Sequence, residues 1–444
     1  MSKIQPNRIG KLPNLHMVLD FRICRPYNSD IANNLSSDKE KELVDLKITK
    51  IEVFRLPTAN SKQNSPIGCR IHTDAGICGD GEAGMAYGVG GTAAFGMVCD
   101  LAELVVGMDP LQTELIWETM YKKTFWGQNG GPVVFSGIAA IDVALWDIKG
   151  KFFNVPVYQL LGGKVRDKLR TYASQLQFGW GQVGVSEHLW AVTPEDYAHN
   201  TRLAVEEGFD AIKVDFFDRD EEGKPLSFLD TTGILTPKQL KMVESRMKAV
   251  REAAGDDVDI IMENHSYPDA LGAVQLAKLA EKYNIMAFEE PNTPTTQTVE
   301  YIAKYTSVPI ANGERLFSRW QYADYFKRNL LQLAQPDIGN CGGISEVKKI
   351  CDMAHAYDAG IQVHVAGSPL ATNAALHVEC TIPNFIIHEH HTCNRMDTCL
   401  GLTKYNLQPE NGYFTVPDLP GIGNEFLQEA IDRATLYKVV EAPV

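Results

Sequence analysis

The fold can be predicted from the stretch Val258-Asp-Ile-Ile-Met-Glu-Asn-His265, a short apolar run that ends in charged residues. A second run of the same form follows at Ile285-Met-Ala-Phe-Glu-Glu290. Apolar runs of about four to eight residues with polar ends are typical of buried strands. Working outward from these two, we predict eight strands: Leu169–Ser174, Ala211–Val214, Val258–Met262, Ile285–Phe288, Val308–Ala311, Leu330–Ala334, Ile361–Val363 and Asn384–Ile387.

The segments between these strands carry the signals of helices. Thr193-Pro194 and Thr236-Pro237 each place a capping hydroxyl before a proline at the first helical position, and Gly208 and Gly255 fit the ends of the two helices. Eight β-α repeats over about 250 residues predict an α/β barrel of the (β/α)₈ kind. The alternative is a doubly wound sheet, which usually has a glycine fingerprint after its first strand. The glycine cluster at 84–91 follows no such strand, so we predict a loop there.

The N-terminal part of the chain has a different organisation. Residues 1–45 show no periodic pattern and no signal peptide, which predicts an irregular arm. Residues 46–56 alternate apolar and polar side chains, and residues 67–72 fit a partner strand. A helix with one apolar face follows within residues 134–148. We therefore predict an arm (1–45), a small α+β domain (46–165) and the barrel (166–404).

Composition limits the classes of function. The chain has 444 residues with 56 acidic and 42 basic side chains and a net charge of −14, which argues against nucleic acid or an anionic membrane as the main partner. No segment approaches the ~18 apolar residues of a membrane-spanning helix. The nine cysteines form no Cys-x-x-Cys pair, which favours free thiols and a cytoplasmic protein.

Titratable residues follow the predicted strands in a regular series. From Glu263 onward, the spacings between successive members are 26, 25, 23, 27 and 25 residues. One such group per β-α unit is expected to converge on the mouth of the barrel, where active sites of this fold lie. The series consists of Lys213, Glu263 with His265, Glu289 with Glu290, Glu314, Asp337, His364 and Glu389.

The types of residue in this series indicate a chemistry. Glu263, Glu289 and Glu314 offer hard oxygen ligands, which suit Mg²⁺, and the three carboxylates would repel one another without a cation. An Asp337 carboxylate bonded to His364 would make that histidine a general base near neutral pH. His265, two residues beyond Glu263, is expected on the same side of its strand, where it could act as an acid.

These residues belong to stretches that resemble the enolase superfamily. The resemblance is to its mandelate-racemase-like branch and, within it, to acid-sugar dehydratases of the galactonate and mannonate type. It covers about residues 46–440. The matching stretches are Ser136-Gly-Ile-Ala-Ala-Ile-Asp-Val-Ala-Leu-Trp-Asp-Ile-Lys-Gly150, Tyr158-Gln-Leu-Leu-Gly-Gly163, Phe288-Glu-Glu-Pro291, Asn312-Gly-Glu-Arg-Leu-Phe-Ser-Arg-Trp320, Gln335-Pro-Asp337 and Gly342-Gly-Ile344.

The resemblance implies a fold and a site. The fold is a modified (β/α)₇β TIM-like barrel with an α+β capping domain, completed by about residues 405–444. The implied Mg²⁺ ligands are Glu263, Glu289 and Glu314. The implied catalytic residues are the pair His364 and Asp337, together with Glu389, which would hydrogen-bond a substrate carboxylate oxygen if protonated.

The sequence departs from the family pattern at two places. The first ligand is commonly aspartate in this branch, and it is Glu263 here. Racemases of the branch carry Lys-x-Lys on the second strand, whereas this chain has Lys213-Val-Asp215, so the second base is missing and racemisation is disfavoured. Glu263-Asn-His265 resembles the Asp-x-His of the dehydratases, which implies that His265 protonates the departing hydroxyl. Lys213 and Asp215 are expected to contact the substrate, and residues 217–235 are an insertion after the second strand.

The function that follows is a Mg²⁺-dependent sugar-acid dehydratase, a hydro-lyase that removes the C2 proton and the 3-hydroxyl to give a 2-keto-3-deoxy acid. The alternatives are another superfamily reaction, such as epimerisation or cycloisomerisation, and a non-catalytic metal- or ligand-binding regulatory protein. We expect a small-molecule sugar acid as the partner and a homo-oligomer. The capping loops around 57–66 and 84–91 are expected to select the substrate.

Overall fold

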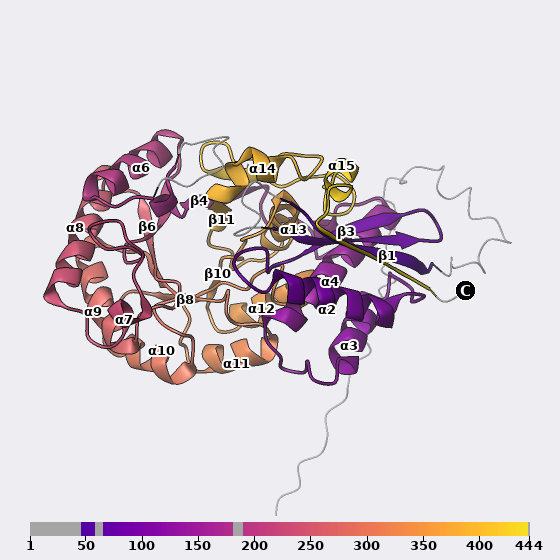
Figure 1. The fold of residues 1–444 in the computed structure, drawn as a ribbon, viewed down its shortest axis with the longest axis horizontal. Coiled ribbons are helices and arrows are strands. Elements are labelled where there is room, and N and C mark those ends of the chain that lie inside the picture. The colour runs from indigo at the N-terminus through magenta and orange to yellow at the C-terminus, as the bar shows by residue number, and fades with distance from the viewer. Residues whose placement is uncertain (1–45, 58–64, 181–189, 443–444) are drawn as a thin grey trace, which may run out of the picture. The chain divides into compact units, whose positions relative to one another are not determined.

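The computed structural model describes residues 46–57, 65–180 and 190–442. The predicted arm and part of the first capping loop lie outside them. The described residues form a small antiparallel sheet and a large, mainly parallel sheet (Figure 1). Among the helices described, none has the length and apolarity to cross a membrane.

The small sheet belongs to the α+β cap. Its strand order is β13-β1-β2-β3, and every neighbouring pair is antiparallel. The C-terminal strand β13 pairs with β1, so that Val440 lies opposite Ile51, and the two ends of the described chain meet in one sheet. The strands are β1 (Ile48–Arg55), β2 (Ile67–Thr73), β3 (Cys78–Ala83) and β13 (Leu436–Glu441).

The large sheet forms the barrel. Its order is β10-β9-β8-β7-β6-β5-β4-β11, with β12 paired to the outside of this path on β4. An isolated parallel bridge links Ile361 of β10 to Phe385, three residues before β11 at the other end of this order. The predicted barrel with an α+β cap is therefore confirmed. The strands are β4 (Lys168–Ser174), β5 (Ala211–Asp215), β6 (Asp259–Glu263), β7 (Ala287–Glu289), β8 (Ile310–Asn312), β9 (Leu333–Ala334), β10 (Gly360–Ile361), β11 (His388–His391) and β12 (Tyr413–Thr415).

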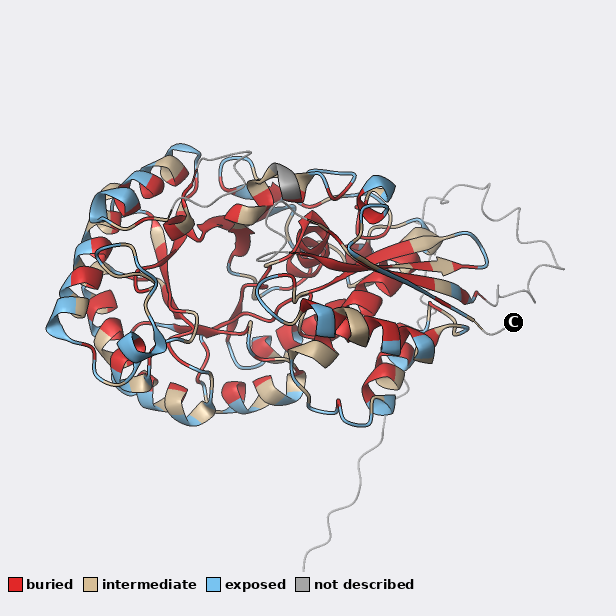
Figure 2. Cartoon of the chain, in the orientation of Figure 1, coloured by how far each residue is buried: buried red, intermediate tan, exposed pale blue. Residues whose placement is uncertain are grey.

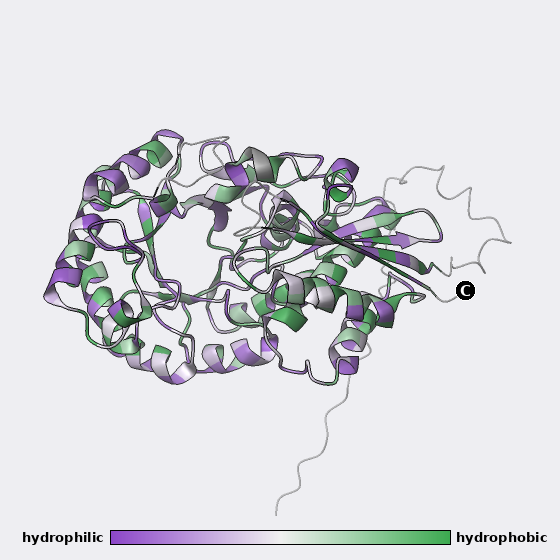
Figure 3. Ribbon diagram, viewed as in Figure 1, coloured by the Kyte–Doolittle hydropathy of each residue, from purple (hydrophilic) through white to green (hydrophobic). Residues whose placement is uncertain are grey.

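Helices surround the barrel strands, with their apolar sides turned inward and their exposed sides turned outward (Figures 2 and 3). The N-caps predicted at Thr193 and Thr236 are present, each as part of a capping box, and Gly255 is the C-cap of α8. The helices are α2 (Gly91–Val105), α3 (Thr113–Lys123), α4 (Pro132–Phe153), α5 (Val157–Leu160), α6 (Pro194–Glu206), α7 (Phe228–Thr231), α8 (Pro237–Ala254), α9 (Ala270–Ala280), α10 (Thr296–Ala303), α11 (Arg319–Lys327), α12 (Gly343–His355), α13 (Pro369–Glu379), α14 (Asp397–Leu400) and α15 (Gln428–Ile431), with short 3₁₀ turns η1 (Leu176–Phe178), η2 (Glu281–Tyr283) and η3 (Thr392–Arg395).

The eighth strand differs from its prediction. The sequence pattern placed it at residues 384–387, whereas β11 comprises His388–His391. The apolar run contributes only a bridge at Phe385, and the strand itself is made of buried polar residues. Burial of such residues is tolerated because they find partners: His388 Nδ1 lies 2.6 Å from Glu379 Oε2 on α13. Glu389 consequently lies within the last strand and not after its end.

Helix α4 joins the cap to the barrel and is buried on almost every side. The Asp142 carboxylate on this helix accepts hydrogen bonds from the backbone N–H and the hydroxyl of Ser345 on α12, at 2.9 and 2.6 Å. On its other side α4 packs against β3, where Gly79 and Gly81 allow the strand to approach the helix backbone. The cap is thereby fixed above the barrel.

We expect Gly81→Ala to destabilise the protein. A Cβ at this position would lie 1.9 Å from the carbonyl oxygen of Ala140, so strand and helix must separate. Overpacking of this kind costs about 1–3 kcal/mol, which denaturant unfolding would measure. Gly96→Ala on α2 is the matched control, because nothing lies within 4 Å of its Cβ and alanine favours a helix. Equal stability of the two variants would contradict this account of the cap.

Candidate active site

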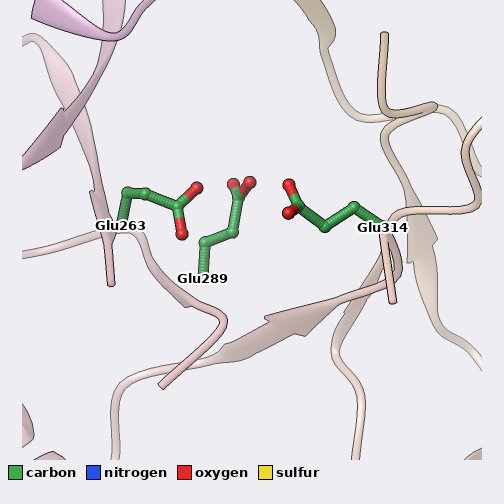
Figure 4. Close-up of side chains that lie close together, drawn as sticks. All are labelled: Glu263, Glu289 and Glu314. Carbon is green, nitrogen blue, oxygen red and sulfur yellow. The ribbon is translucent and has the colours of Figure 1, made fainter. Parts of the chain in front are cut away.

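Three glutamates lie together at the carboxyl ends of neighbouring strands (Figure 4). Glu263 ends β6, Glu289 ends β7 directly beside it, and Glu314 follows β8 by two residues. Each offers one carboxylate oxygen within 4.8 Å of the others. Parallel strands bring their carboxyl ends to one edge, which is why residues 25 and 26 positions apart meet here.

The electrostatics of this acidic trio fit a hard cation. Burial raises the pKa of Glu289 well above its ordinary value, and the neighbouring Glu263 carboxylate raises it further. Glu263 Oε2 is fully buried and forms no hydrogen bond, and its charged neighbour is Lys213 Nζ at 3.2 Å. Three carboxylates this close oppose one another's ionisation unless a cation lies between them. Such a set of oxygen ligands is expected of a Mg²⁺ site. Within the described part of the chain, this is the group of acidic, histidine or cysteine side chains placed to hold a metal.

Lys213 lies beneath the trio, and its side chain is completely buried. Its Nζ is 2.5 Å from Glu289 Oε1, 2.9 Å from Glu389 Oε1 and 3.2 Å from Glu263 Oε2. Burial alone would lower the pKa of Lys213, but the carboxylates outweigh it and hold the pKa well above its ordinary value. Lys213 is therefore a permanent positive charge that faces the glutamates.

His364 and Asp337 form a hydrogen-bonded pair at the ends of neighbouring strands. His364 Nδ1 lies 2.5 Å from Asp337 Oδ2, and Asp337 Oδ1 accepts the backbone N–H of Gly339 at 2.7 Å. The other ring nitrogen, Nε2, is 2.9 Å from Glu314 Oε2. Burial would lower the pKa of His364, but the charges of Glu314 and Glu389 outweigh it and raise the pKa. The structure thus brings the predicted pair to the edge of the acidic trio.

His265 and Asp215 form a second pair of the same kind. His265 Nδ1 lies 2.9 Å from Asp215 Oδ2, while Asp215 Oδ1 accepts the backbone N–H of Phe217 at 2.8 Å. Asp215 is 1% exposed. It lies beside Glu263, because β5 is parallel to β6 and pairs Asp215 with Glu263. The structure places the Asp215 carboxylate against His265, and the expected contact of Asp215 with the substrate stays a prediction.

Glu389 is an acceptor in this structure. It receives hydrogen bonds from the Ser174 hydroxyl at 2.7 Å and the Val365 backbone N–H at 3.2 Å, besides its contact with Lys213. Burial opposes its ionisation, but the charges of Lys213 and His364 outweigh burial and hold the pKa of Glu389 below its ordinary value. Both Glu389 oxygens accept hydrogen bonds in this arrangement, and the expected role of Glu389 toward a substrate carboxylate stays a prediction.

Several residues of the site were not singled out from the sequence. Gln335 Nε2 donates to Glu289 Oε2 at 2.6 Å, and Arg315 contacts both Glu290 and Glu314. On the cap, Glu82 accepts hydrogen bonds from the backbone and hydroxyl of Ser368, and burial raises the pKa of Glu82 to about 7. Gln335 and Arg315 lie in the stretches that carried the family resemblance, and that was the available signal.

Comparisons with known proteins agree with this geometry. The family description "Mandelate racemase / muconate lactonizing enzyme, N-terminal domain" matches residues 46–162, and "Enolase C-terminal domain-like" matches residues 196–430. The D-galactonate dehydratase of Ralstonia pickettii is 33% identical over 405 residues, 90% of this chain and 96% of that protein. The D-galactonate dehydratase of Pectobacterium atrosepticum is also 33% identical, over 87% of this chain and 94% of its own.

Solved structures extend the comparison. A member of the enolase superfamily from Salmonella Typhimurium is 45% identical with a TM-score of 0.86, and the match covers 89% of this chain and all of that one. The 3,6-anhydro-D-galactonate cycloisomerase of Zobellia galactanivorans is 26% identical with a TM-score of 0.73, over 87% of this chain and 99% of its own.

Fold and site together define a barrel enzyme whose mouth carries an acidic trio between two histidine–aspartate pairs. The chain belongs to the enolase superfamily, in the branch of mandelate racemase and muconate lactonizing enzyme. It is a hydro-lyase, because its curated relatives are dehydratases. They are about one-third identical to this chain, and the match covers nearly their whole length. The predicted family and the predicted class of enzyme are confirmed.

Proposed function

We propose that this enzyme dehydrates a sugar acid, either an aldonic or an aldaric acid, with Mg²⁺ held by Glu263, Glu289 and Glu314. The observation that carries the proposal is the close trio of carboxylates with two histidine–aspartate pairs beside it, each pair joining the ends of two neighbouring strands. A bound Mg²⁺ would polarise the substrate carboxylate and stabilise the negative charge that develops there.

The two histidines divide the proton transfers. His364 takes the proton from C2 as the C2–H bond breaks, and Asp337 keeps the other ring nitrogen protonated, so that Nε2 is the acceptor. His265 donates a proton to the 3-hydroxyl as the C3–O bond breaks, and water leaves. The resulting enol tautomerises to the 2-keto-3-deoxy acid, so that the overall change is the loss of one water.

Charge at the mouth suits this division. The Glu314 carboxylate raises the pKa of His364. This favours a proton on Nε2 as long as Glu314 has no other positive charge beside it. Positive charge bound by Glu314 would weaken that effect and leave Nε2 able to accept a proton. Lys213 keeps its own charge beside Glu289 and Glu389, so in this proposal it orients and neutralises these carboxylates and does not bind the substrate directly.

The enzyme is tested on a library of aldonic and aldaric acids in the presence of Mg²⁺. D-galactonate is the first compound to try, because the curated relatives are named D-galactonate dehydratase. The expected result is a 2-keto-3-deoxy product from at least one acid, detected chemically and by mass. A chelator-treated sample is the control and should be inactive. If no acid of the library loses water, the proposal is wrong and epimerisation or cycloisomerisation becomes the function to test.

We expect His265→Asn to stop elimination more strongly than it stops exchange of the C2 proton with deuterated solvent. Asparagine cannot deliver a proton to the leaving hydroxyl, while His364 still removes and returns the proton at C2. General acids contribute about 10² to 10⁴ in rate, so product formation should fall by a factor in that range. Exchange is followed by NMR on the 3-deoxy analogue, which cannot eliminate. Loss of C2 proton exchange in His265→Asn, with exchange retained in His364→Asn, would reverse the two roles.

A further inference from the structure

Asp215 is buried at the end of β5, and its carboxylate has two separate partners. Oδ1 accepts a hydrogen bond from the backbone N–H of Phe217, and Oδ2 is hydrogen-bonded to Nδ1 of His265. We propose that Asp215 is a positioning residue for His265, and that it acts through a closed ring of hydrogen bonds with Gln177 and Gln175. The inference rests on the proposed function, because it concerns the proton that His265 transfers.

The ring runs through four residues, and its direction is set by the backbone. The N–H of Asp215 donates to Gln177 Oε1 at 3.2 Å. The amide nitrogen of Gln177 then faces Gln175 Oε1, and Gln175 Nε2 lies 3.3 Å from His265 Nε2. His265 Nδ1 closes the ring on Asp215 Oδ2 at 2.9 Å.

One fixed donor orients every other group in this ring. A backbone N–H can only donate, so it selects the oxygen of Gln177, and that choice turns the amide nitrogen of Gln177 toward the oxygen of Gln175. The amide nitrogen of Gln175 then lies beside His265 Nε2. At the other ring nitrogen the Asp215 carboxylate can only accept, so Nδ1 carries a proton and donates it to Asp215.

The backbone around the ring is held in an uncommon conformation. His265 and Ser266 have φ values of +47° and +63°, and Gln175 has +67°, all in the region that residues other than glycine rarely adopt. Such conformations persist where surrounding contacts over-determine them, and they cluster at functional sites. Here Glu263 Oε1 accepts hydrogen bonds from the backbone N–H groups of Asn264 and His265 at 2.9 and 2.7 Å. The backbone of His265 is thus held by Glu263, and its imidazole ring is held by Asp215.

The pair has the same construction as the one proposed for the base. Asp337 accepts the N–H two residues further on with Oδ1 and binds His364 with Oδ2, as Asp215 does with Phe217 and His265. In both pairs the aspartate keeps a proton on Nδ1, so a proton that moves to or from the substrate moves at Nε2. For His265 to donate, Nε2 must carry a proton from solvent and the 3-hydroxyl must displace Gln175.

The test compares one substitution in the two pairs. Asp215→Asn should lower kcat for elimination by about 100- to 1,000-fold, within the range for a general acid, and leave KM, C2 proton exchange and Mg²⁺ affinity within about threefold of wild type. Asp337→Asn, the matched control, should lower elimination and exchange together. A purely structural role for Asp215 would lower both rates alike, so the separation of the two rates is the readout.

Two outcomes would overturn the proposal: elimination by Asp215→Asn at the wild-type rate, or equal loss of elimination and exchange. If Asp215→Asn does not fold, Gln177→Ala opens the same ring and should show the same separation with a smaller loss. Failure of the proposed function is seen first and separately, because the wild-type enzyme would then dehydrate no sugar acid of the library.

Discussion

His364→Asn is expected to abolish both elimination and exchange of the C2 proton. His364 is the histidine next to the acidic trio whose Nε2 faces Glu314, and asparagine in its place cannot accept a proton at C2. The remaining pair does not substitute for it, because Nε2 of His265 faces Gln175. A general base contributes about 10² to 10⁴ in rate, so both reactions should fall by at least that factor. Product formation and deuterium incorporation measure the two losses on one preparation.

His377→Asn is the control for this substitution. His377 is also fully buried, but it lies on α13 and stacks on Tyr158 away from the trio. It should change stability and leave the ratio of exchange to elimination as in wild type. Exchange that persists in His364→Asn at more than a tenth of the wild-type rate would show that another group removes the C2 proton.

Glu289→Gln should weaken Mg²⁺ binding and turnover together. Glu289 is the central member of the trio, and the substitution removes one of three ligand charges while leaving Lys213 without its 2.5 Å partner. Changes to groups that only support a ligand cost about 10- to 100-fold in affinity or activity, so loss of a ligand should reach at least the upper part of that range. Isothermal titration with Mg²⁺ gives the affinity, and the dehydration assay gives the rate.

Glu379→Gln provides the comparison for this loss. Glu379 is equally buried in the barrel domain, but it pairs with His388 and belongs to no group of close carboxylates among the described residues. Its amide variant is expected to bind Mg²⁺ as wild type does, whatever its stability. Full activity of Glu289→Gln, or of wild-type enzyme in chelator, would remove the basis for assigning all three glutamates as ligands.

The sequence predicted much of the barrel because its information is local and periodic. Most strands are short apolar runs, two of the helices begin with a Thr-Pro pair, and from Glu263 onward a titratable residue recurs every 23 to 27 positions. A parallel barrel brings those positions to one edge whatever the loops do, so Glu263, Glu289 and Glu314 could be grouped before any contact was known. The eighth strand escaped the pattern, because β11 consists of polar residues whose burial depends on distant partners.

By itself, the sequence determined the fold class, the family and the acidic trio, since these follow from apolar periodicity and from residues at fixed positions along the chain. Only the tertiary structure decided which side chains face one another across strands. It turned Asp215 toward His265, placed Lys213 among the glutamates and directed hydrogen bonds from Ser174 and Val365 at Glu389. The physical reason is that partner choice and charge state depend on distances of a few ångströms between elements far apart in sequence, in a buried site where such interactions are strong.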